Sequence, residues 1–156
     1  MLLSCIKAMR PKQWAKNVFL FAAIIFSLKF DDPTSIRKII IAFFAFSFVS
    51  SSGYILNDAR DIEVDKLHPK KKFRPLASGA VSLSVAYTEM VLIFLLGMGL
   101  AYYVDVKLLA ITFTYFLTTM SYSLYFKNIV ILDVMFIASG FLWRVIAGAI
   151  AIDVKI

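Results

Sequence analysis

The stretch Asn57-Asp-Ala-Arg-Asp-Ile-Glu-Val-Asp65 directly follows an uncharged apolar run, residues 39–56, that is long enough to cross a membrane. If the helix continues through this stretch, Asp58, Asp61 and Asp65 lie at positions i, i+3 and i+7, on one helical face. Carboxylates stacked within about two turns repel one another unless a cation lies between them. Mg²⁺ takes oxygen ligands and commonly joins carboxylates to substrate phosphates. The stretch therefore predicts a Mg²⁺–diphosphate site at the end of a membrane helix.

A solvated loop is the simplest alternative, in which the acidic side chains pair with neighbouring Lys and Arg residues. Three features of the stretch favour the metal site. The carboxylates begin where a membrane helix ends, Asn57 adds an amide oxygen to the same face, and the basic residues follow as a separate block.

The composition is that of an integral membrane protein. Of the 156 residues, 61% are hydrophobic, and the mean hydropathy is +0.82, whereas soluble domains are about 45–50% apolar. A net charge of +7 in a soluble protein would suggest a nucleic-acid partner. Here the bases lie beside apolar segments, so we expect anionic lipid or phosphate as the partner and no nucleic acid. The single Cys5 excludes an internal disulfide, and no cleavable signal peptide is evident.

We expect an all-α, polytopic transmembrane bundle of about five spans, forming one membrane domain over residues 1–156. The first span is short, because its charge-free core, residues 17–28, has only 12 residues; an interfacial or strongly supported helix also suits it. The only long hydrophilic connection, residues 57–78, is expected to be a functional loop. The spans are expected at residues 14–30, 39–56, 81–104, 108–126 and 129–152.

Lys and Arg are unevenly divided between the two ends of these spans. Eleven lie in the N-terminal segment, in residues 57–78 and at Lys127, and five lie in the connections at the opposite end. Because basic residues concentrate in cytoplasmic loops, the N-terminus and the acidic stretch are expected on the cytoplasmic face of the cell membrane.

The block Lys70-Lys-Lys-Phe-Arg-Pro75 follows the acidic stretch. It would serve as a cytoplasmic anchor in many membrane proteins, and it would also serve as a clamp on a diphosphate. Arg74 suits two-pronged contact with phosphate and is a catalytic candidate together with Asp58 and Asp61, whereas the lysines act as point charges or attract lipid. His68 has no Cys or His neighbour in the sequence, which argues against zinc.

Ionisable residues inside an apolar span are costly and indicate function by default. Asp133 and Arg144 lie about three turns apart on a similar face of the last span. A structural ion pair within the bundle is an equally weighted alternative. Glu89 is a weaker candidate, and Lys127 and Asn128 are placed to reach phosphate or to act as ordinary residues of the interface.

The acidic stretch resembles the first aspartate-rich motif of the UbiA-type prenyltransferase family. These proteins are all-helical membrane enzymes with a Mg²⁺-bound diphosphate at the cytoplasmic side. Further stretches resemble the polyprenyl-phosphate phosphoribosyltransferase branch, typified by the decaprenyl-phosphate enzyme of mycobacteria. They are RPKQWAKN (residues 10–17), HPKKKFRPLASG (68–79), YSLYFKN (122–128) and DVMFIASGFLWRVIAG (133–148).

The resemblance implies residue roles and a reaction. It implies that Asp58, Asp61 and Asp65 hold Mg²⁺ and the donor diphosphate, with Asn57 assisting. Asp133 and Arg144 would line the cavity. The implied donor is phosphoribosyl diphosphate, and the implied acceptor is a lipid-linked polyprenyl (decaprenyl) phosphate used for cell-wall precursors. Contacts to phosphate or ribose phosphate are implied for Lys16, Asn17, Lys72, Arg74, Lys127 and Asn128.

Other functions remain open from the sequence. An enzyme of the same family would instead move a prenyl group from its diphosphate to an aromatic acceptor, but the many basic residues favour a more heavily phosphorylated pair. A channel or transporter subunit would use the intramembrane charges as a conduction path, although the charges concentrate at one membrane face. A structural membrane protein with a lipid-binding basic loop is the third alternative.

The resemblance implies that the sequence corresponds to the N-terminal half of the family's nine-helix fold. Family members carry a second acidic motif in their C-terminal half. We therefore expect that a C-terminal half or a partner chain is required, and that the isolated chain is inactive.

Overall fold

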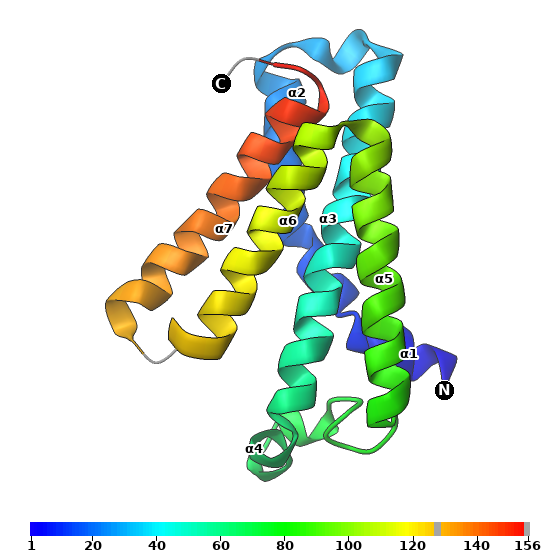
Figure 1. Ribbon diagram of the computed structural model, residues 1–156, viewed down its shortest axis with the longest axis vertical. Helices are drawn as coiled ribbons and strands as arrows, with labels where there is room; N and C mark the ends of the chain where they lie inside the picture. The colour runs from blue at the N-terminus through cyan, green and yellow to red at the C-terminus, as the bar shows by residue number, and fades with distance from the viewer. Residues whose placement is uncertain (127–128, 155–156) are drawn as a thin grey trace.

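The computed structural model describes residues 1–126 and 129–154, apart from the side chains of residues 130 and 133. All regular secondary structure in these residues is helical, which confirms the all-α class. The bundle is built on four long helices, α3 (Pro33–Arg60), α5 (Leu83–Val104), α6 (Val106–Ser121) and α7 (Val130–Ala151) (Figure 1). Shorter segments precede and connect them: α1 (Leu2–Ala8), the 3₁₀ helix η1 (Pro11–Phe21), α2 (Ala22–Phe26), η2 (Lys29–Asp31), α4 (Ile62–Leu67), η3 (Lys71–Phe73) and the π-helical turn η4 (Tyr122–Phe126).

Side-chain caps set where three of the long helices begin. Asp32 accepts hydrogen bonds from the backbone N–H groups of Thr34 and Ser35, at 3.1 and 3.0 Å, and so caps α3. Ser82 and Asp105 cap α5 and α6 in the same way. The hydrogen bond from the Ser35 hydroxyl, followed by the two backbone contacts, lowers the pKa of Asp32.

Helix α3 lies at the centre of the bundle, and small residues permit its close packing against α5. The buried hydroxyl of Ser50 donates to the Ser47 carbonyl, so it needs no partner on another helix. On α5, a Cβ atom at Gly97 would lie 2.9 Å from the Ala45 carbonyl oxygen. Glycine at this position therefore allows the two antiparallel backbones to approach closely.

The first expected span, residues 14–30, is wrong as a single α-helix. The chain forms η1 over 11 residues and α2 over 5 residues. Because a 3₁₀ helix rises about 2.0 Å per residue and an α-helix about 1.5 Å, η1 and α2 together extend roughly 30 Å. The segment runs beside α3 and α7, and the Trp14 indole N–H donates to the Ser51 hydroxyl at 2.9 Å. This packing stabilises the extended 3₁₀ conformation of η1, which the short apolar core does not stabilise by itself.

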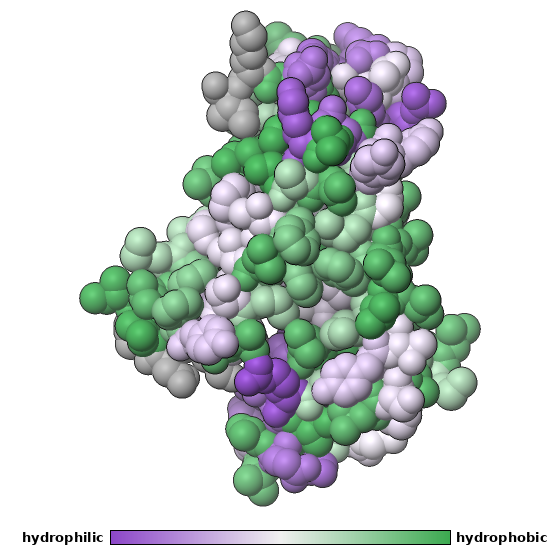
Figure 2. Space-filling view, viewed as in Figure 1, coloured by the Kyte–Doolittle hydropathy of each residue, from purple (hydrophilic) through white to green (hydrophobic). Residues whose placement is uncertain are grey.

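The molecule has the surface of a membrane protein. Helices α3 and α5 and residues 134–151 of α7 are long and apolar enough to cross a membrane. Figure 2 shows hydrophobic residues over the middle of the molecule and hydrophilic residues gathered towards its two ends. In α5 only 11% of the most apolar window is buried, so most of this apolar surface is open to contact with lipid or with another apolar surface. The expectation of about five spans stays a prediction, because α6 has 16 residues and the first segment is not a continuous helix.

The connection over residues 57–78 is more structured than the expected loop. It contains the last turn of α3, then α4 and η3. Leu76 and Val81 are buried against Ile55 of α3, Ala8 of α1 and Ala86 of α5. This second apolar cluster fixes the basic block beside the end of α3.

Gly148 of α7 provides a test of the packing against η1. A Cβ atom there would lie 2.1 Å from the Leu20 carbonyl oxygen, a backbone atom that cannot move independently. We expect Gly148→Ala to lower the free energy of unfolding by roughly 1–3 kcal/mol, despite alanine's better helix propensity. Gly99→Ala is the matched control, because nothing lies within 4 Å of a Cβ there. Thermal unfolding in detergent micelles measures both; equal stability of the two variants would contradict the described packing.

Candidate functional site

The acidic stretch does not form one continuous helix. Helix α3 ends at Arg60, Asp61 is the junction residue with φ −93° and ψ 10°, and α4 begins at Ile62. The expected stacking of Asp58, Asp61 and Asp65 along one face of a single helix is therefore wrong. The chain bends at Asp61, so the direction of each carboxylate depends on the bend and on its partners.

Asp58 and Asp65 nevertheless come together, because an arginine lies between them. Arg74 Nη1 donates to Asp58 Oδ1 at 3.1 Å and to Asp65 Oδ2 at 2.6 Å. The two aspartates are 2% and 1% exposed. Arg10 also donates to Asp58 Oδ1, and Lys71 Nζ lies 3.9 Å from Asp65 Oδ1. The cation expected between the carboxylates is, in this structure, a guanidinium group.

Asn57 ties the acidic stretch to the segment that follows α6. Its side-chain amide donates to Asp61 Oδ2 at 3.1 Å, and its Oδ1 accepts a hydrogen bond from the Ser123 hydroxyl at 2.5 Å. Asn57 therefore contacts the acidic stretch, and its expected role beside the metal stays a prediction. These contacts also bring η4 to the end of α3.

The donor atoms of the site suit Mg²⁺, but their arrangement is not a complete ligand set. Within residues 1–126 and 129–154, no group of three or more His, Cys, Asp or Glu side chains lies close enough to hold a metal ion. Mg²⁺ does not require such a group, because one or two carboxylates, water and substrate phosphates commonly complete its octahedron. The buried, adjacent carboxylates of Asp58 and Asp65 fit that smaller role chemically.

Two residues of the site are not among those expected from the sequence. Arg10 directly precedes η1 and has a left-handed backbone, φ 54°, which directs the chain from α1 into the 3₁₀ segment. Its guanidinium carbon lies 5.2 Å from the ring centroid of Tyr54. Tyr54 precedes Asn57 and Asp58 by about one helical turn, a spacing visible in the sequence. Arg10 has no local signal of this kind, because 48 residues separate it from Asp58.

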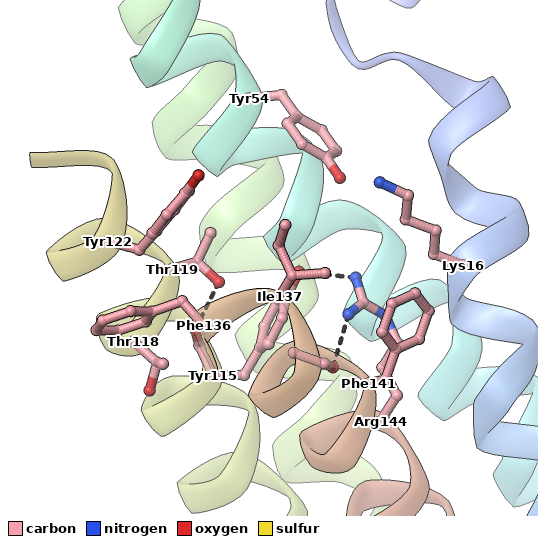
Figure 3. Close-up of a pocket in the computed structure, with 11 residues that line it drawn as sticks. Lys16, Tyr54, Tyr115, Thr118, Thr119, Tyr122, Phe136, Ile137, Phe141 and Arg144 are labelled. Atoms are coloured by element: carbon pink, nitrogen blue, oxygen red, sulfur yellow. Dashed lines mark hydrogen bonds between the residues drawn. The ribbon is translucent and has the colours of Figure 1, made fainter. Parts of the chain in front are cut away.

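A cavity of about 170 Å³ lies beside the acidic residues. Figure 3 shows Lys16 of η1 and Tyr54 of α3 directed into it from one side, and Tyr115, Tyr122 and Phe136 on the other. The residues that line the cavity come from η1, α3, α6, η4 and α7. In this part of the molecule the α6–α7 pair spreads away from α3 (Figure 1). Tyr54 joins the two regions, because it lines the cavity and contacts Arg10 of the acidic site.

Arg144 brings a buried positive charge to the cavity. It is 5% exposed and donates to the Asn17 side chain, the Gly140 carbonyl and the Tyr115 hydroxyl at 2.7, 2.7 and 2.9 Å. Its guanidinium also lies over the Tyr115 ring, 4.9 Å from the centroid. All these acceptors are neutral, and no ion pair of Arg144 occurs in the described part of the chain. A charge buried in this way favours an anionic ligand.

The other expected residues divide into three groups. Lys16 lines the cavity, and its expected contact with phosphate stays a prediction. Asn17 is fully buried and does not line the cavity; it holds Arg144 in position instead. Lys72 is exposed, with Nζ 5.2 Å from the Phe73 ring centroid, and does not line the cavity. Lys127, Asn128 and the side chain of Asp133 lie outside the described residues.

Comparison with known proteins identifies relatives over nearly the whole chain. Residues 18–156 match the model of the UbiA prenyltransferase family. The decaprenyl-phosphate phosphoribosyltransferase of Mycolicibacterium smegmatis is 35% identical over 155 residues, covering 97% of this chain and 49% of the relative. The corresponding protein of Corynebacterium glutamicum is 36% identical over 156 residues, covering 97% and 47%. The chain thus spans about half the length of the curated relatives it matches.

Two solved structures share the fold. One, of digeranylgeranylglyceryl phosphate synthase, gives a TM-score of 0.84 at 24% identity, covering 96% of this chain and 53% of that one. The other, a UbiA homologue from Archaeoglobus fulgidus bound to GPP and Mg²⁺, gives 0.81 at 20% identity, covering 98% and 55%. The arrangement of helices is therefore that of about half of each of these membrane proteins.

Arg74→Gln tests the role of the guanidinium between the two aspartates. The change leaves buried carboxylates with less positive charge, so we expect a loss of about 2–4 kcal/mol in the free energy of unfolding. Lys72→Gln, which removes an exposed charge from the same block, should change it by less than about 0.5 kcal/mol. Thermal unfolding in micelles provides the comparison.

A double substitution separates this ion pairing from simple loss of packing. Adding Asp65→Asn to Arg74→Gln removes the unpaired carboxylate, so part of the lost stability should return. If the double variant is less stable than Arg74→Gln alone, the pairing is not the source of the stability.

Proposed function

The chain belongs to the UbiA prenyltransferase family, and we propose that it supplies the donor-binding half of a Mg²⁺-dependent membrane transferase. The proposed donor is phosphoribosyl diphosphate and the proposed acceptor is a polyprenyl phosphate. The observation that carries the proposal is the pairing of an acidic site with a cationic cavity at one end of α3. Tyr54 lies between the two.

The two regions suit the two ends of one donor. Phosphoribosyl diphosphate carries a diphosphate at one end and a phosphate monoester at the other. The acidic residues would hold the diphosphate through Mg²⁺, and Lys16 and Arg144 would hold the monoester in the cavity. A prenyl diphosphate has phosphate at one end only, so it would leave the buried charge of Arg144 without an anion.

In the proposed reaction, an acceptor phosphate oxygen bonds to the anomeric carbon as the bond to the diphosphate oxygen breaks. Mg²⁺, held by Asp58, Asp61 and Asp65, would neutralise the departing diphosphate. Arg74 and Lys72 would offer N–H donors to the same oxygens. The protein's contribution is mainly to position the reactants and to stabilise the charge that develops.

A second candidate is prenyl transfer to an aromatic acceptor. Aromatic rings form much of the cavity lining, among them Tyr115, Tyr122, Phe136 and Phe141. Such a lining suits an isoprenoid chain, and one structural relative was solved with GPP bound. The buried cation at Arg144 and the Lys16 ammonium favour the phosphoribosyl donor over this alternative.

The complete active site is proposed to need more than these residues. The relatives that match the chain are about twice its length, so a C-terminal half or a partner chain would complete the cavity and the metal ligands. We also propose that the N-terminus and the acidic site face the cytoplasm, as the distribution of basic residues predicts.

The acidic site is tested by Mg²⁺-dependent binding of phosphoribosyl diphosphate to the purified chain, measured by calorimetry. Asp61→Asn removes one proposed oxygen ligand, so we expect binding at least roughly tenfold weaker, or lost. Glu63→Gln is the matched control, because this exposed residue of α4 pairs with Lys66 and does not contact the site. Unchanged binding by Asp61→Asn would refute the proposed metal site.

The donor is tested by comparing two ligands on one variant. Lys16→Met removes an ammonium group from the cavity and leaves the acidic site intact. We expect it to weaken phosphoribosyl diphosphate binding about tenfold and geranyl diphosphate binding by less than about twofold. An equal loss for both ligands would mean that the cavity does not hold the monoester, and would favour the prenyl donor.

A further inference from the structure

An open groove of about 610 Å³ lies on the N-terminal side of the acidic site. Figure 1 shows α1 lying across the lower part of the bundle instead of along it, and the groove runs beside this helix. It is distinct from the cavity that Arg144 lines and shares none of that cavity's residues. Its main side chains are those of Leu3, Ile6, Lys7, Arg10, Lys12 and Arg74.

The groove is rich in positive charge. Arg10 and Arg74 bond to the buried carboxylates of the acidic site, yet their side chains remain 24% and 25% exposed. Lys7 and Lys12 are exposed, and no ion pair of either occurs within the described residues. Four cations therefore face the groove, and the two carboxylates behind them, Asp58 and Asp65, offset only part of the charge.

The same groove has an apolar half. Leu3 is 83% exposed and Ile6 is 48% exposed, although both are aliphatic. A short helix that presents leucine and isoleucine beside lysine, and that lies across a membrane bundle, is typical of a segment in the plane of the bilayer interface. Apolar side chains in that position would contact hydrocarbon, and the basic side chains would contact headgroups.

We propose that this groove binds a membrane lipid whose headgroup is a phosphate monoester. The headgroup lies between Lys7 and Lys12 with the guanidinium groups of Arg10 and Arg74 beneath it, and the hydrocarbon chain covers Leu3 and Ile6. A monoester suits the groove better than a diester, because it carries up to two negative charges and three terminal oxygens for convergent N–H donors. The proposal rests on the proposed function in that a polyprenyl-phosphate acceptor has the same headgroup and Arg74 is shared with the proposed donor site. Its test is separate from the transfer reaction, because Lys7 and Lys12 lie outside that donor site.

General electrostatic anchoring is the competing explanation for these lysines. Basic residues near a membrane attract any anionic headgroup, and the effect depends on how many charges are present. A built groove depends on where the charges are and on the form of the headgroup. The two explanations therefore predict different changes in lipid affinity when the same number of charges is removed inside the groove and outside it, at the same end of the molecule.

The test measures binding of a fluorescent short-chain phosphatidic acid to the purified chain in detergent micelles. The double variant Lys7→Gln/Lys12→Gln should bind about tenfold more weakly or worse. The control Arg60→Gln/Lys66→Gln removes the same charge from exposed residues near the acidic site but outside the groove, and should change affinity by less than about twofold. Thermal unfolding of both variants checks that each remains folded.

Four results would overturn the proposal. The control variant losing as much affinity as the groove variant would indicate diffuse attraction. Phosphatidylglycerol with the same chains displacing the probe as well as phosphatidic acid does would show that the monoester is not recognised. Competition by inorganic phosphate at the same concentration as the lipid would show that the hydrocarbon chain contributes nothing to binding. Unchanged lipid affinity of Leu3→Ser would show the same.

Discussion

The neutralisation of two buried aspartates by arginines from other parts of the chain is the constraint on which this end of the molecule depends. Asp58 and Asp65 are almost fully removed from solvent, and a carboxylate in that position is costly unless it is paired. Arg74 satisfies both, and Arg10 adds a second contact to Asp58. These contacts fix three segments relative to one another: the start of η1, the end of α3 with α4, and the basic turn after η3.

Two regions rich in charged side chains then lie near each other in the bundle. On one side are the carboxylates of Asp58 and Asp65 with the arginines that bond to them. On the other is a cavity with the buried charge of Arg144, whose hydrogen-bond acceptors among the described residues are all neutral. The neutral acceptors around Arg144 come from η1, α6 and α7, so the packing of these elements positions the charge. A donor with phosphate at both ends, as proposed above, would match this distribution.

Much of the architecture could be predicted from local patterns. The bounds of α5 and α7 lie within about two residues of the expected spans, because apolar runs and capping residues act over short distances. The first segment is different, since its 3₁₀ geometry depends on contacts such as that between Trp14 and Ser51. The bend at Asp61 was also not evident from the sequence, because the local pattern of residues is equally compatible with a continuous helix and with an interrupted one.

The sequence by itself determined that this protein is a helical membrane protein and where its acidic stretch and basic block lie along the chain. Hydropathy, charge distribution and the spacing of Asn57, Asp58, Asp61 and Asp65 are local properties, readable without coordinates. Only the tertiary structure decided which charges meet. The contact between Arg10 and Asp58 joins residues 48 positions apart, and that between Arg144 and Asn17 joins residues 127 apart. No local periodicity encodes such pairs, because they form only when the helices pack and exclude water from the groups between them.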